Sequence, residues 1–162
     1  MRIFQAEGAQ LLQELPLPNI VELKFSPRGT YISTWERPRT YPRFTHLSYS
    51  PVPSLPLPTV KPEDGSQHKN LRVFSASTGE ELISFTQKSQ DNWDLQYTIS
   101  ESHAIRLVGS EIQVFRPAEW AKGIVDKLKV EGTTSVSLSP GLNPSVAVFV
   151  AEKKVGILRD LV

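Results

Sequence analysis

The sequence of 162 residues contains no cysteine. This absence excludes disulfide bonds, zinc sites built on thiolates and cysteine nucleophiles, and it fits a reducing compartment, so we expect a cytoplasmic protein. Excess charge is absent as well, because 18 basic residues stand against 17 acidic residues and the formal net charge is +1. Any contact with nucleic acid must therefore rest on a local group of basic residues rather than on the field of the whole chain.

Long hydrophobic runs are scarce. Residues 1–15 lack the apolar core of a secretory signal, because glutamine and glutamate interrupt them. The stretch 133–151 carries no charge, but Pro140, Gly141 and Pro144 lie within it. These residues favour strand, turn and strand over a membrane span, so we expect no contact with a membrane.

Signatures of the common enzyme classes are missing too. The chain has no glycine-rich phosphate loop, no His-Glu-x-x-His and no Gly-x-Ser-x-Gly. The three histidines, His46, His68 and His103, are far apart in the sequence, so solvent-exposed side chains are favoured over a shared metal. We expect a non-catalytic protein without a cofactor, a metal or a small-molecule substrate.

An internal repeat is present instead. Leu71-Arg-Val-Phe is echoed by Ile112-Gln-Val-Phe, 41 residues later. At the same interval Tyr97-Thr-Ile-Ser is followed by Leu138-Ser-Pro-Gly, and Phe25-Ser-Pro-Arg-Gly is a third copy of that position. An interval near 40 residues is typical of the blade of a β-propeller.

Short strands separated by turns account for most of the sequence. Val21, Leu23 and Phe25 alternate with polar residues, which predicts a strand whose polar side faces water. Residues 118–128 have fair helix propensity, but the repeat favours a strand there. We expect strands at 21–25, 31–35, 71–75, 81–85, 95–99, 104–108, 112–115, 125–130, 136–138, 146–150 and 156–159.

The repeat also predicts how the strands are grouped. Residues 1–4 align with 71–74 and residues 10–16 with 80–86, so the chain is expected to open with the third and fourth strands of a blade. The prediction is a single all-β domain over residues 1–162, a WD40-like β-propeller segment of about three four-stranded antiparallel blades that does not close a ring. Such a chain would be a fragment, a truncated product or one part of an assembly, with exposed sheet edges.

One repeat unit is interrupted by a proline-rich insertion at about residues 38–68. The interval from Phe25 to Tyr97 is 72 residues, and seven of the 13 prolines lie between Pro38 and His68. Proline cannot donate to a β-ladder, so a loop is expected there.

Basic and aromatic residues alternate in this insertion and at its edges, a composition typical of contacts with single-stranded nucleic acid. A solvated loop that prolines keep extended is the alternative interpretation. The candidate contacts to RNA or to a protein partner are Arg37, Arg39, Tyr41, Arg43, Phe44, Lys61 and Lys69.

Trp93-Asp94 has the form of the dipeptide that names one propeller class, but it precedes a first strand, whereas that dipeptide ends a third strand. The large apolar surface of Trp93 is expected to pack one blade against the next.

Several short motifs occur in the order and approximate spacing of one known family. They are Phe25-Ser-Pro, Ser33-Thr-Trp, Asn70-Leu71, Ser84-Phe85 with Asn92-Trp93, and Leu138-Ser-Pro-Gly ahead of Val146-Ala-Val. In these motifs the chain resembles the eukaryotic translation initiation factor 2A family. The resemblance implies an early section of a larger propeller and a cytoplasmic factor that delivers initiator methionyl-tRNA to the small ribosomal subunit without GTP. It also implies mRNA and other translation factors as partners. A propeller scaffold for protein–protein contacts is the alternative function.

Overall fold

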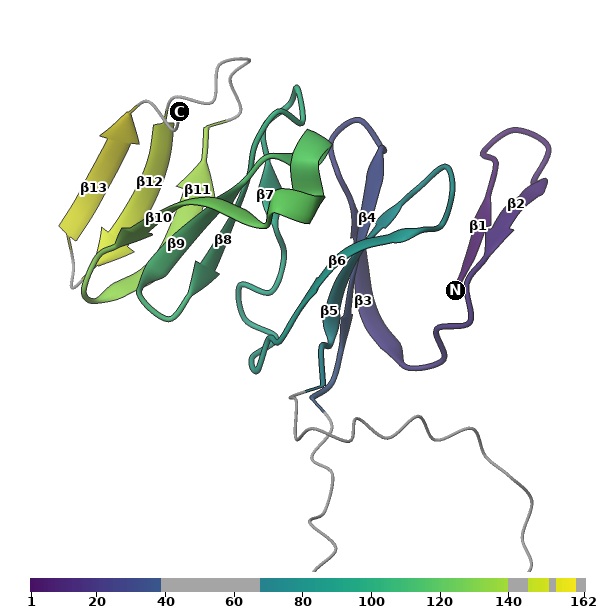
Figure 1. Cartoon of the computed structure of the whole chain (residues 1–162), viewed down its shortest axis with the longest axis horizontal. Coiled ribbons are helices and arrows are strands. Elements are labelled where there is room, and N and C mark those ends of the chain that lie inside the picture. The colour runs from purple at the N-terminus through teal and green to yellow at the C-terminus, as the bar shows by residue number, and fades with distance from the viewer. Residues whose placement is uncertain (39–67, 140–145, 152–153, 160–162) are drawn as a thin grey trace, which may run out of the picture.

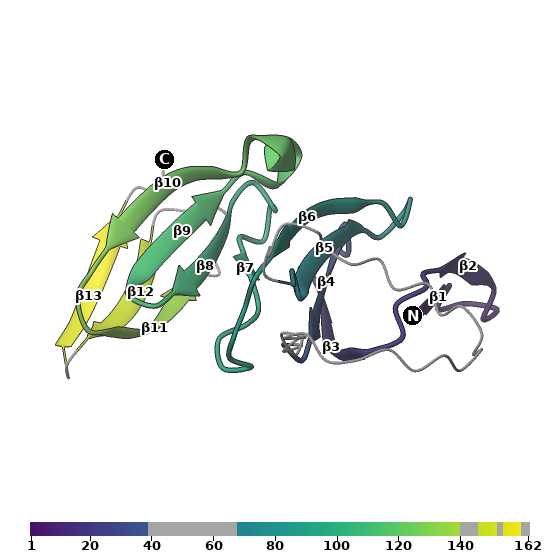
Figure 2. The ribbon, with the colours of Figure 1, turned by 60° about the horizontal axis from the view of Figure 1, so that its bottom comes forward.

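The computed structural model describes residues 1–38, 68–139, 146–151 and 154–159. These residues form thirteen strands and one 3₁₀ helix, arranged in four antiparallel sheets. The sheets stand side by side along the long axis of the molecule (Figure 1), and they keep the same order in the rotated view of Figure 2. No helix in the described part of the chain has the length and apolar character needed to cross a membrane.

Two of the sheets are complete four-stranded meanders, in which neighbours along the chain are neighbours in the sheet. The first contains β3 (Ile20–Phe25), β4 (Tyr31–Glu36), β5 (Leu71–Ser75) and β6 (Glu81–Phe85). The second contains β7 (Gln96–Tyr97), β8 (Ala104–Val108), β9 (Glu111–Phe115) and β10 (Ile124–Lys129). We call them the first blade and the second blade.

The other two sheets have fewer strands among the described residues. The N-terminal sheet pairs β1 (Arg2–Phe4) with β2 (Leu11–Glu14), and the C-terminal sheet contains β11 (Thr133–Leu138), β12 (Val146–Ala151) and β13 (Lys154–Arg159). The predicted fold, a β-propeller segment of about three blades without a closed ring, is confirmed.

The 41-residue repeat has a direct structural meaning. Leu71-Arg-Val-Phe and Ile112-Gln-Val-Phe lie in β5 and β9, the third strands of the two complete blades. Phe25, Tyr97 and Leu138 are the last residues of β3, β7 and β11, the first strand of each sheet. The 41-residue spacing therefore identified the equivalent strands of the sheets correctly.

Two predicted strands need correction. The strand expected at 95–99 is confined to Gln96–Tyr97, because the chain turns at Thr98. The hydroxyl of Thr98 accepts a hydrogen bond of 3.2 Å from the backbone N–H of His103. The preference for strand over helix in residues 118–128 is wrong at the start of that range, where a 3₁₀ helix spans Pro117–Lys122, while the strand expected at 125–130 is present at Ile124–Lys129. Pro117 has no N–H with which to extend a ladder, and Gly123 leaves the helix at φ +69°, a conformation that favours glycine.

The main core lies between the two complete blades. Trp93 is buried there, as the sequence predicted, and its Nε1 donates a hydrogen bond to Glu22 Oε2. A ring cluster adjoins it, in which Tyr31 stacks on Tyr97 at 6.0 Å between centroids and both contact Trp120 edge-on. The buried residues of this core are Trp35, Leu71, Val73, Trp93, Leu95, Ala104, Phe115 and Trp120.

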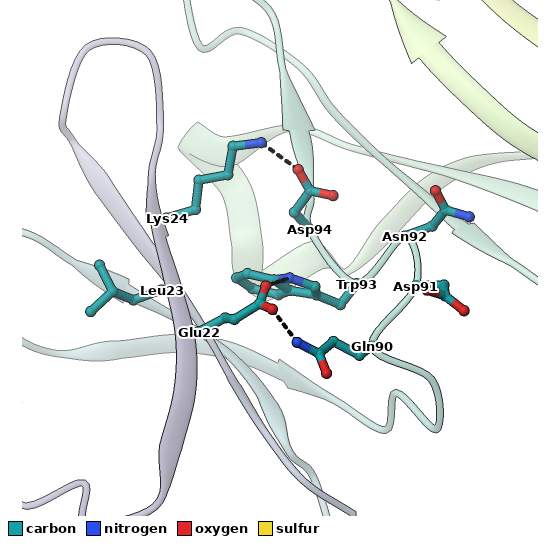
Figure 3. A pocket seen from close by; sticks show the side chains of 8 residues that line it. All are labelled: Glu22, Leu23, Lys24, Gln90, Asp91, Asn92, Trp93 and Asp94. Carbon is teal, nitrogen blue, oxygen red and sulfur yellow. Dashed lines mark hydrogen bonds and ion pairs between the residues drawn. The ribbon is translucent and has the colours of Figure 1, made fainter.

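The apolar side of β3 is exposed, contrary to the prediction. Val21, Leu23 and Phe25 are exposed, whereas Glu22 on the other side of the strand is half-buried. Glu22 and Lys24 point toward the loop that precedes β7 in the second blade, as Figure 3 shows. On the apolar side, Leu23 and Phe25 line a small cavity with residues of the N-terminal sheet but stay about half exposed.

Candidate nucleic-acid interface

The ends of three strands of the first blade meet at one edge, next to the predicted insertion. The backbone N–H of Glu36, the last residue of β4, donates to the carbonyl of Asn70 at 2.9 Å. Arg37 and Lys69 are the neighbours of this pair, and both side chains are exposed. The structure thus brings these two candidates together, while Arg39, Tyr41, Arg43, Phe44 and Lys61 lie outside the described residues.

Asn70 fixes this edge. Its side-chain Nδ2 donates to the carbonyl oxygens of Glu36 at 2.7 Å and Gln87 at 2.8 Å, and its Oδ1 accepts the amide of Gln87 at 2.8 Å. Its own backbone N–H donates to the carbonyl of Phe85 at 3.0 Å. One buried asparagine therefore ties together the end of β4, the start of β5 and the segment after β6.

Lys88 adds a third exposed cation at the same edge, because it follows Gln87 directly. Arg37, Lys69 and Lys88 form no ion pair with any other residue of the described ranges. We call these three residues the basic edge.

Arg106 reaches under the basic edge from β8 of the second blade. Its guanidinium donates to the carbonyl of Thr86 at 2.8 Å and to Gln87 Oε1 at 3.0 Å, and it lies 4.4 Å from the ring centroid of Phe85. Burial lowers the pKa of Arg106 to about 10, so the side chain is still protonated at neutral pH. None of the carboxylates described in the structure pairs with it.

Beside this edge lies a polar cleft of about 530 Å³ between β3 and residues 90–94. Figure 3 shows Glu22 meeting Gln90 and Trp93, and Lys24 meeting Asp94, across the cleft. Glu22 and Asp94 therefore have partners across the cleft, and these contacts join the two blades. The described residues contain no group of three or more histidine, aspartate or glutamate side chains that could bind a metal.

Sequence reasoning missed Lys88, the Asn70 contacts and the place of Arg106. Lys88 lies outside the insertion, so the basic and aromatic composition of the insertion did not mark it as a contact. Arg106 lies between apolar residues in β8, at a position that would face solvent in a strand with one exposed side. The blade that contains β8 lies between two other sheets (Figure 1), so the side chain is buried. Asn70 could have been found by its place immediately before a buried third strand.

Comparison with known proteins gives a consistent result. No protein-family profile matches the sequence. The chain is 40% identical over 152 residues to eukaryotic translation initiation factor 2A of Schizosaccharomyces pombe, which covers 94% of this chain and 23% of that protein. It is 32% identical over 139 residues to the Drosophila melanogaster protein of the same name, with 83% and 19% covered.

Among solved structures, a crystal structure of a eukaryotic initiation factor matches with a TM-score of 0.79 and 34% identity. The match covers 98% of this chain and 35% of that one. The chain spans about a quarter of the length of the curated relatives that it matches. Similarity along almost the whole sequence, on the same fold, shows that this chain belongs to the eukaryotic translation initiation factor 2A family.

Proposed function

We propose that the protein is a non-catalytic, cytoplasmic translation initiation factor that binds the small ribosomal subunit and delivers initiator methionyl-tRNA without GTP. The observation that carries the proposal is the 40% identity to the Schizosaccharomyces pombe factor along 94% of the chain. Messenger RNA and other translation factors are the further partners proposed. The test is binding of initiator methionyl-tRNA to the full-length protein in the absence of nucleotide, with elongator methionyl-tRNA as the control.

Within this function, we assign the basic edge to contact with RNA phosphates. Arg37, Lys69 and Lys88 are exposed, and Arg106 adds a buried positive charge below them. The carboxylate of Glu36, buried at the same strand end, offsets part of this charge. Phosphate oxygens are the partners of unpaired Arg and Lys side chains on RNA-binding surfaces, and they position a protein without reading sequence.

The insertion carries the remaining candidate contacts of the same proposal. Arg39, Arg43 and Lys61 lie in the sequence between Arg37 and Lys69, and Tyr41 and Phe44 could stack on unpaired bases. The proposal for these five residues rests on their composition and on their place between two residues of the basic edge.

The experiment compares two triple substitutions in the full-length protein that remove the same charge. The first replaces Arg37, Lys69 and Lys88 with alanine, and the matched control replaces Lys122, Lys127 and Lys129. Each control lysine pairs with a nearby glutamate. Co-sedimentation with small ribosomal subunits is measured across a salt series.

We expect the first triple variant to weaken binding and to reduce the slope of log K against log salt by about 2, because each single-strand phosphate contact contributes roughly 0.7. The control should keep the wild-type slope. An equal loss in both variants would assign the effect to net charge alone. Binding that does not respond to salt in the wild type would favour a protein scaffold instead.

A further inference from the structure

The turn between β3 and β4 holds an anion that the protein itself supplies. The backbone N–H of Arg28 donates to Glu101 Oε1 at 2.7 Å, and the hydroxyl groups of Ser26 and Thr30 also lie against this carboxylate and favour its charged form. Glu101 belongs to the loop between β7 and β8, so the second blade places a carboxylate in a turn of the first. Backbone N–H groups that converge in a turn form a concave site for an anion.

The turn between β7 and β8 has the same backbone. The N–H of Thr98 donates to the carbonyl of His103 at 3.0 Å, and the hydroxyl of Thr98 accepts from the N–H of His103 at 3.2 Å. The same two bonds close the β3–β4 turn, at 3.0 and 2.9 Å. The central residue is left-handed in both turns, at φ +58° for Glu101 and φ +76° for Gly29. The two turns are therefore equivalent, and they lie at the same end of neighbouring blades (Figure 1).

The β7–β8 turn keeps the donors of the β3–β4 turn and adds one. Hydroxyl residues occupy the places of both Ser26 and Thr30, and Ser100 contributes a third hydroxyl group. The hydroxyl oxygens of Thr98, Ser100 and Ser102 lie 3.0 to 3.4 Å from one another. Ser102 is exposed and Ser100 is half-buried, so a ligand can reach this group from solvent.

A positive charge stands beside the β7–β8 turn. The register of β8 and β9 places Arg116 opposite His103. Burial and, after it, the charge of Arg116 hold the pKa of His103 below its ordinary value, as expected for neighbouring side chains. Arg116 is exposed and forms no ion pair with any carboxylate of the described ranges. The carboxylate of Glu119 also lies near Arg116, but it already accepts a hydrogen bond from Lys122 at 2.7 Å.

The contact that fills the first of these turns is not repeated at the second. Glu101 directs its carboxylate away from its own turn and into the first blade. The next copy of the repeat has no acidic residue to take the same role, because residues 133–151 carry no charge. Among the residues that the structure describes, no carboxylate forms a hydrogen bond with the hydroxyl groups of the β7–β8 turn.

We propose that the β7–β8 turn, residues 98–103 together with Arg116, binds a phosphate group. A phosphate has more acceptor oxygens and more charge than the carboxylate in the first turn, which matches the added hydroxyl of Ser100 and the positive charge of Arg116. The group can come from free phosphate or from the phosphodiester backbone of an RNA. The turn lies at the end of the sheets opposite the basic edge (Figure 1), so this site is separate from the RNA contact proposed above.

The test measures binding of inorganic phosphate to the full-length protein by equilibrium dialysis at constant ionic strength, and it requires neither ribosomes nor tRNA. Ser102→Glu places a carboxylate in the turn, and Ser102→Gln is its neutral control. Arg116→Gln removes the positive charge, and Arg28→Gln removes an exposed arginine at the first turn, which Glu101 already fills. A thermal melt of each variant checks that it is folded. A short single-stranded RNA then competes for the bound phosphate.

We expect the wild type to bind phosphate and Ser102→Glu to weaken binding at this site by about tenfold or more, because a carboxylate in the turn repels the anion and takes its donors. Arg116→Gln should weaken binding roughly fivefold, whereas Ser102→Gln and Arg28→Gln should stay within about twofold of the wild type. Displacement by RNA would identify a phosphodiester as the ligand, and retention would identify free phosphate; both results support the site. A wild type that binds no phosphate, or equal losses in Arg28→Gln and Arg116→Gln, would overturn the proposal.

Discussion

Replacing Asn70 with alanine should destabilise the protein more than any exposed asparagine would. The substitution removes three hydrogen bonds of 2.7 to 2.8 Å from a side chain that is almost fully buried. At about 1 kcal/mol for each bond the loss is about 3 kcal/mol, and the amide of Gln87 is left buried without this partner. For a domain of this size the melting temperature should fall by roughly 10 °C.

Urea unfolding followed by tryptophan fluorescence measures this effect, because Trp35, Trp93 and Trp120 are all buried in the core between the blades. Asn19→Ala, at an exposed position, is the matched control and should change the free energy of unfolding by less than about 0.5 kcal/mol.

Asn70→Asp is a second variant that tests the hydrogen bonds donated by this side chain. Aspartate keeps the oxygen that accepts from Gln87, but it turns a charged oxygen toward the carbonyl groups of Glu36 and Gln87. It should therefore be at least as destabilising as alanine at pH 7 and should recover part of the stability as the carboxyl is protonated in acid. A loss below 1 kcal/mol for Asn70→Ala would refute the view that this side chain holds the strand ends together.

Three further predictions concern contacts between sheets. Glu101 is buried, which by itself would raise its pKa, but hydrogen bonds from the first turn of the first blade lower it below the ordinary value. Its stabilising effect is therefore complete above the unfolded pKa and is lost as the pH falls through the folded pKa, so Glu101→Gln should flatten that part of the stability–pH profile measured by urea unfolding. Gln96→Ala removes bonds of 2.6 and 2.8 Å to the backbone of β11, and hydrogen exchange of the β11 amides should become faster while that of β5 stays unchanged. Gly79→Ala should lower the melting temperature more than Gly109→Ala, since both have positive φ but only at Gly79 would the new Cβ lie 2.5 Å from the Gln13 side chain; equal losses would contradict this.

The sequence alone determined the architecture. The equivalence of Leu71–Phe74 with Ile112–Phe115, and of Phe25 with Tyr97 and Leu138, predicted which strands correspond, because strand alternation and turn residues are local properties of the chain. It also placed Trp93 in the packing between blades, whereas the structure brought Arg37 and Lys69 to the same edge.

Only the tertiary structure decided which sheets bury those strands and which hydrogen bonds join them. Leu23 and Leu95 read alike in sequence, yet one is exposed and the other buried, because burial depends on the neighbouring sheet. The same holds for Asn70, whose hydrogen bonds join segments up to 34 residues apart, and for Arg106, whose burial requires the blade beside it. A repeat fixes what each strand is, whereas the neighbours that a strand meets are a property of the assembled sheets.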